Sequence, residues 1–219
     1  MFLGHFSIGF VAKALAPKTS LGSLFLASVL LDLIWSTLLI LGIEKVWIAP
    51  GTAEASTLIF SYFPFSHSLL LAIMWGILVA VIYFMIRRYV RGALVMGLVV
   101  ICHWFTDLIV HLPDLPLYPG GARFGLGLWS SKSGTLVIEM LLFLIGLGIY
   151  FNATATKSDG GDWRIGFLLL VLMGIYFVNL FGPPPPSINA VAWTGEAQWL
   201  LVLWGYWINR YRVSVKHYP

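Results

Sequence analysis

The chain has 219 residues, of which 59% are hydrophobic, 16% aromatic and only 10% charged. A soluble globular domain carries about 25% charged residues, so this composition excludes an ordinary soluble domain and predicts an integral membrane protein. The formal net charge of +4 does not indicate a nucleic acid partner, because the basic residues are spread over short loops. Membrane lipids are the partners that this composition predicts.

Apolar runs of about 20 residues are long enough to cross a bilayer as helices. Together with a shorter run at 2–16, they predict an all-α integral membrane protein, with six long transmembrane helices plus a short N-terminal helix. No internal repeat or second domain is evident, so 1–219 is expected to form a single polytopic membrane domain. The long helices are expected at 20–43, 67–86, 92–112, 134–151, 165–182 and 191–209.

The short segment 2–16 has two placements open to it. It could lie flat at the membrane surface, or it could pair with 20–43 as a helical hairpin with Met1 outside. In the hairpin, His5 and Asp32 both lie about 18–20 Å from the connecting turn. This shared depth favours the hairpin.

The basic residues indicate how the bundle is oriented. Most of them fall in connections on one side, whereas Lys45, Arg123 and Lys132 fall on the other. The positive-inside rule places the first side in the cytoplasm, so we expect a cytoplasmic C-terminus. The residues on that side are Lys13, Lys18, Arg87, Arg88, Arg91, Lys157, Arg164, Arg210, Arg212 and Lys216.

The stretch from Ile101 to His111 carries the strongest functional signal. His103, Asp107 and His111 follow one another at intervals of four residues, so they share one face of a helix. Ionisable side chains at membrane depth are costly and mark functional sites by default. The His-x-x-x-Asp spacing also suits two ligands of one divalent ion.

Other polar residues are expected at similar depth in the outer half of the bundle. No Lys or Arg lies at the depth of Asp32 or Asp107, so each carboxylate requires a cation or a proton. Several imidazoles lie nearby, which favours a bound divalent cation over a shared proton. The residues in this half are His5, Asp32, His67, His103, Asp107, His111, Glu139 and Glu196.

Roles remain open for His67, Glu139 and, outside this set, Arg123. His67 starts roughly 10 Å above Asp32 and can join it only if the turn Pro64–Ser66 dips inward. Glu139 is favoured over Glu196 as a general base. Arg123, in an outer Gly-rich loop, could hold an anionic substrate group, although a lipid headgroup contact is favoured.

The chain resembles a known family in the order of four motifs. Gly4-His5, Leu31-Asp32, Ser66-His67-Ser68-Leu69-Leu70 and His103-x-x-x-Asp107 are similar to the bacterial and archaeal membrane-bound metal-dependent hydrolases, the YdjM-like group. The branch with a Pro-x-Ser-His-Ser-Leu-Leu motif is the most similar. The resemblance covers about 1–150 and leaves out the helices 165–182 and 191–209.

The resemblance implies a bacterial inner-membrane protein with one zinc site. By analogy with zinc-dependent phospholipase C, the ligands would be Asp32, His67, His103 and Asp107. Asp107 would also bridge to a second ion held by His111, Glu139 or His5. This ligand set is an implication of the resemblance and its analogy.

The leading hypothesis is a divalent-metal hydrolase, with zinc or manganese, that cleaves an ester or phosphoester at a site open to the periplasmic side. Asp107 and Glu139 would be catalytic, and a lipid-linked substrate would suit a site within a leaflet. Three alternatives remain: a non-catalytic accessory subunit of a larger membrane complex, a haem or chlorophyll protein, and a transporter. The carboxylates argue against a tetrapyrrole, and the lack of repeats argues against a transporter.

Overall fold

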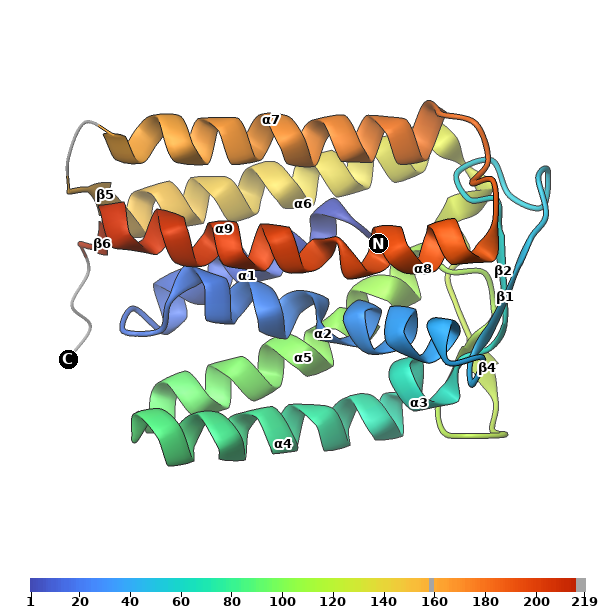
Figure 1. Cartoon of the computed structure of the whole chain (residues 1–219), viewed down its shortest axis with the longest axis horizontal. Coiled ribbons are helices and arrows are strands. Elements are labelled where there is room, and N and C mark those ends of the chain that lie inside the picture. Colours follow the sequence, from blue (N-terminus) through green and yellow to red (C-terminus); the bar gives the residue numbers. More distant parts are fainter. Residues whose placement is uncertain (158–159, 216–219) are drawn as a thin grey trace.

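The protein is an all-α bundle whose helices run roughly parallel to one long axis (Figure 1). The structure is a computed structural model, and it describes residues 1–157 and 160–215. The helices are α1 (Leu3–Leu15), α2 (Leu21–Ile40), α3 (Pro64–His67), α4 (Leu69–Arg87), α5 (Val90–Val110), α6 (Lys132–Ala153), α7 (Gly160–Phe181), α8 (Ile188–Glu196) and α9 (Gln198–Tyr211).

Three antiparallel strand pairs lie at the two ends of the bundle (Figure 1). We call the end with β1–β4 the loop end and the end with β5 and β6 the turn end. A short 3-10 helix, Leu128–Ser130, precedes α6. The strand pairs are β1 (Lys45–Ile48) with β2 (Leu58–Tyr62), β3 (Leu115–Pro116) with β4 (Arg123–Phe124), and β5 (Thr154–Thr156) with β6 (Arg212–Ser214).

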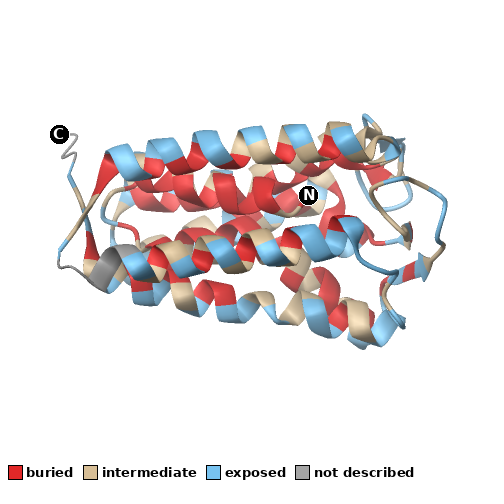
Figure 2. Cartoon of the chain, turned by 90° about the horizontal axis from the view of Figure 1, so that it is seen from above, coloured by how far each residue is buried: buried red, intermediate tan, exposed pale blue. Residues whose placement is uncertain are grey.

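The expected class, an all-α membrane protein, is confirmed. Among the described residues, five helices are long and apolar enough to cross a membrane, namely α2, α4, α5, α6 and the Trp163–Phe181 part of α7. Figure 2 shows buried residues on the inward sides of the helices and exposed residues on the outward sides. The exposed side of α4 is apolar and includes Ile77, Val81 and Ile86, as expected of a surface that faces lipid.

The sixth expected long helix, 191–209, is divided in the structure. α8 ends at Glu196 and α9 begins at Gln198, with Ala197 in a turn between them. The break lies where α8 packs closely on α2, because a Cβ at Gly195 would meet the Ser36 hydroxyl and Glu196 accepts a hydrogen bond from Thr37 Oγ1. The two pieces still follow one another along the bundle (Figure 1).

Helix α1 is buried inside the bundle, where it packs against α2, α5 and α6. The structure therefore agrees with the hairpin rather than with a helix on the surface. Its thirteen residues span only about 20 Å. Met1 is 8% exposed and lies inside the bundle.

The connections that carry most of the basic residues lie together at the turn end (Figure 1). These are the α1–α2 turn, the α4–α5 turn and the strands β5 and β6. Lys45, Arg123 and Lys132 belong to β1, β4 and α6 at the loop end. Lys216 lies outside the described residues, and the distribution of the others has the one-sided form that the sequence predicts.

The contact between α4 and α5 gives a stability prediction. A Cβ added at Gly76 would lie 2.7 Å from the Gly97 carbonyl oxygen, whereas one added at Gly148 on α6 would meet open space. We expect Gly76→Ala to lower the free energy of unfolding by about 1–3 kcal/mol through overpacking. Gly148→Ala should instead be neutral or raise it by up to about 1 kcal/mol. Thermal unfolding in detergent measures both, and equal effects would contradict the close helix contact.

Candidate metal centre

Four helices bring three histidines and two aspartates together inside the bundle. α1 carries His5, α2 carries Asp32, α3 carries His67, and α5 carries both His103 and Asp107. The side chains of four of them are at most 3% exposed, and that of Asp32 is 24% exposed. The structure thus places five of the sequence-predicted ligands at one site that is largely closed to solvent.

The short helix α3 allows His67 to reach this site. Pro64 is its first residue, and Ser68 leaves the helix with an extended backbone before its hydroxyl caps the start of α4. A Pro at the first position and a Ser cap are favourable helix starts. The chain therefore turns inward at Pro64–Ser66, the turn that had to bend inward for His67 to reach Asp32, and the two side chains come together.

The distances at the His67 side fit one small ion. His67 Nε2 lies 3.6 Å from Asp32 Oδ1 and 3.5 Å from Asp107 Oδ2. His103 Nε2 lies 3.7 Å and 3.2 Å from the same two oxygens. Ligand atoms bound tetrahedrally to zinc at 2.0–2.2 Å lie about 3.3–3.6 Å apart. These four separations are close to the edges of such a tetrahedron.

His5 and the other carboxylate oxygens form the second side of the site. His5 Nε2 is 3.1 Å from Asp107 Oδ1 and 4.0 Å from Asp32 Oδ2. Its ring stacks on that of His103, with centroids 3.6 Å apart and planes 6° apart. The Met1 amine nitrogen lies 2.5 Å from Asp107 Oδ1. Two groups that could hold a metal ion result, Asp32–His67–His103 and His5–His103–Asp107.

The outer nitrogen of each histidine is held by a hydrogen bond. His103 Nδ1 is 2.8 Å from the Ser28 carbonyl oxygen, which can only accept, so Nδ1 carries the hydrogen. His5 Nδ1 is 3.1 Å from Thr106 Oγ1, and that hydroxyl donates to the His103 carbonyl. Partners of this kind fix the tautomer and ring orientation of metal-binding histidines.

A residue that the sequence reasoning missed, Glu44, fixes His67. Its buried carboxylate accepts hydrogen bonds from the Phe65 and Ser66 backbone N–H groups and, at 2.5 Å, from the Ser66 hydroxyl. Because that hydroxyl hydrogen is used, Ser66 Oγ accepts from His67 Nδ1 at 2.7 Å. The available signal was a lone acidic residue just beyond the end of an apolar helix.

These hydrogen bonds give the site its chemistry. With hydrogen on each Nδ1, the three Nε2 atoms face the two carboxylates. Nε2 of both His5 and His103 is buried and makes no hydrogen bond. A divalent cation could bind Asp32, His67 and His103, or His5, His103 and Asp107, so the described donor sets fit a metal ion. The Met1 ammonium also pairs with Asp107.

Glu139 has a structural role in the fold. Its Oε2 accepts hydrogen bonds from the backbone N–H groups of Phe2, Leu3 and Gly4, at 2.9, 2.7 and 3.4 Å. A carboxylate at this position satisfies the free N–H groups of the first turn of α1 and interacts favourably with the helix dipole. The catalytic role predicted for Glu139 stays a prediction.

The capping by Glu139 can be tested on stability. Glu139→Ala removes the acceptor of three N–H groups, two of them in buried hydrogen bonds, so we expect the free energy of unfolding to fall by about 2–5 kcal/mol. Glu139→Gln keeps one carbonyl oxygen and should lose about half as much. Thermal unfolding in detergent measures both variants. A Glu139→Ala protein as stable as the wild type would contradict the capping role.

His111 and Glu196 lie outside both metal-ligand groups. His111 Nδ1 is 2.8 Å from Asp114 Oδ1, and its ring lies against Trp129, with centroids 4.2 Å apart. Burial lowers the pKa of His111 from its ordinary value, opposed by the hydrogen bond to Asp114. Glu196 contacts Thr37 near the loop end. The second-ion role of His111 remains a prediction.

No family model, no curated protein and no solved structure matches this chain. The chain is a membrane-like helical protein with a buried His/Asp group that could hold a metal ion.

Proposed function

We propose that the protein is a divalent-metal-dependent hydrolase of the bacterial inner membrane that acts on an ester or phosphoester substrate. One observation carries this proposal: the Nε2 atoms of His67 and His103 each lie 3.2–3.7 Å from one oxygen of Asp32 and one oxygen of Asp107. The motif resemblance to membrane-bound metal-dependent hydrolases supports it. The concentration of basic residues at the turn end supports a cytoplasmic C-terminus and a site nearer the periplasmic side.

Asp32, His67, His103 and Asp107 would hold zinc or manganese. A divalent ion there would lower the pKa of a bound water and polarise an ester or phosphoryl oxygen. Asp107 Oδ1 faces His5 Nε2 at 3.1 Å, so this pair can accept and hold a proton from an attacking water. Asp32 is the partly exposed member of the group, and substrate would approach past its side chain.

An activity assay tests the proposal. Purified protein in detergent is treated with a chelator, reloaded with zinc or manganese, and given chromogenic ester and phosphoester substrates. We expect the wild type to hydrolyse a substrate, chelation to abolish this activity, and either metal to restore it. The His103→Gln variant should be inactive. The control Glu196→Gln, altered outside the site, should retain it. Absence of hydrolysis by the metal-loaded wild type on every ester and phosphoester would contradict the proposal.

The closed site favours a second candidate, a non-catalytic accessory subunit with a structural metal site. Structural zinc sites have four protein ligands and no open position, and the side chains of His5, His67, His103 and Asp107 are at most 3% exposed. Co-purification of a stoichiometric membrane-protein partner with an inactive, metal-loaded chain would favour this candidate. An active protein without a partner would contradict it.

A further inference from the structure

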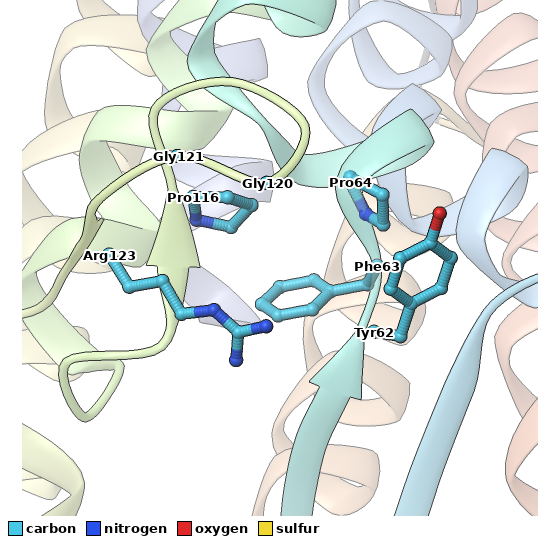
Figure 3. A pocket seen from close by; sticks show the side chains of 7 residues that line it. All are labelled: Tyr62, Phe63, Pro64, Pro116, Gly120, Gly121 and Arg123. Carbon is cyan, nitrogen blue, oxygen red and sulfur yellow. The ribbon is translucent and has the colours of Figure 1, made fainter.

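A small cavity opens between the β2–α3 segment and the β3–β4 hairpin at the loop end. Its volume is about 120 Å³, and it is lined by Tyr62, Phe63 and Pro64 on one side and by Pro116 and Arg123 on the other (Figure 3). Sites that enclose a whole drug-sized ligand measure about 300–1,000 Å³. This cavity therefore suits one small chemical group of a larger molecule, or one small ion.

Arg123 supplies the charge of the cavity. Its guanidinium points across the cavity toward the Phe63 ring (Figure 3), and the other residues that line the cavity are uncharged. Nη2 donates one hydrogen bond, 3.2 Å long, to the Ser61 carbonyl. Among the residues whose side chains are described, 1–157 and 163–215, no carboxylate lies within ion-pair distance of it. A guanidinium has five N–H donors in a planar fork that matches phosphate, so most of them can serve an anion.

The backbone that carries Arg123 is fixed to the bundle. Arg123 pairs with Pro116 across the β3–β4 hairpin, and Leu117 N–H donates to the Ala122 carbonyl at 3.0 Å. The Leu117 carbonyl in turn accepts from Leu70 N–H at the start of α4, at 2.9 Å. The guanidinium thus projects from an anchored hairpin, which reduces the entropy lost when it binds a ligand.

The cavity and the metal centre share one wall. Phe63 lines the cavity, yet it is only 1% exposed. Its ring centroid is 5.5 Å from that of His67 and 6.0 Å from that of His111. Only the Phe63 ring would therefore separate a group bound at Arg123 from His67 of the metal centre.

We propose that this cavity is a phosphate-binding subsite in which Arg123 binds the phosphate group of a molecule at the membrane surface. The claim that this molecule is the substrate rests on the proposed function. Phosphate binding itself does not require a metal. The phosphate can belong to a lipid headgroup or to a soluble ion, and the two sources share the chemistry that the guanidinium recognises.

Direct binding tests the proposal. Chelator-treated protein in detergent is dialysed against radiolabelled inorganic phosphate, and short-chain phosphatidic acid or the matching uncharged diacylglycerol is added as a competitor. We expect saturable phosphate binding that Arg123→Gln weakens about tenfold and Arg123→Lys weakens less. Arg87→Gln, which removes an exposed arginine at the turn end, should bind as the wild type does.

Competition by phosphatidic acid but not by diacylglycerol would identify a lipid headgroup, and competition by neither would identify a soluble phosphate. Both results support the subsite. The subsite would be overturned if the wild type showed no saturable phosphate binding. It would also be overturned if a folded Arg123→Gln protein bound phosphate as well as the wild type does. Asp107→Ala separates the two proposals, because we expect it to lose metal and hydrolysis while keeping phosphate binding.

Discussion

Asp107→Ala is expected to lower the affinity for zinc or manganese at least about a hundredfold, because even residues that only orient metal ligands change affinity by 10–100-fold. Asp107 faces three histidines at once, with Oδ2 3.5 Å and 3.2 Å from Nε2 of His67 and His103 and Oδ1 3.1 Å from Nε2 of His5. Its removal leaves the imidazoles without the carboxylate that they share. Metal content after gel filtration in metal-free buffer measures the loss.

Two further variants make this result specific. Asp107→Asn keeps the shape of the side chain and removes its charge, so it should bind metal poorly while remaining folded. Asp114→Ala changes an aspartate that contacts His111 and belongs to neither group, so it should retain metal. Equal metal content in Asp107→Asn and the wild type would refute the ligand role.

Glu44→Ala should weaken metal binding about 10–100-fold without changing any residue that faces the site. The variant removes the acceptor of two backbone N–H groups of α3 and of the Ser66 hydroxyl. His67 then loses the partner that holds its ring and tautomer. The free energy of unfolding should also fall, by roughly 2–5 kcal/mol, because buried donors lose their acceptor.

Ser66→Ala separates positioning from stability. It removes only the link between Glu44 and His67, so metal affinity should fall as in Glu44→Ala while most of the stability is retained. Isothermal titration with zinc measures the affinities, and thermal unfolding measures the stability. If both variants bind zinc like the wild type, the hydrogen-bonded chain from Glu44 does not position His67.

Periodic patterns in the sequence predicted much of the helix bundle and several residues of the metal centre. Apolar runs located the long helices, because a bilayer requires about 20 residues for each crossing. Helix periodicity put His103 and Asp107 on one face, and counting residues from the turn brought His5 and Asp32 to the same depth. The structure places these four residues together.

The remaining features depend on contacts between distant segments. Glu44 lies beyond α2 and folds back on Ser66, and no periodic pattern records this contact. Glu139 caps α1 from a position more than 130 residues away in the chain. The break at Ala197 lies where α8 packs on α2. The pairing of His111 with Asp114 was open to prediction, because their i, i+3 spacing at a helix end allows it.

X-ray absorption spectroscopy of the zinc-loaded protein tests the metal centre most directly. The structure predicts a first shell of nitrogen and oxygen atoms at about 2.0–2.2 Å, with outer-shell scattering from at least two imidazoles, those of His67 and His103. Asp107→Asn should lose this spectrum. Failure of the folded wild-type protein to retain any zinc or manganese, or a shell without imidazole scattering, would contradict the account.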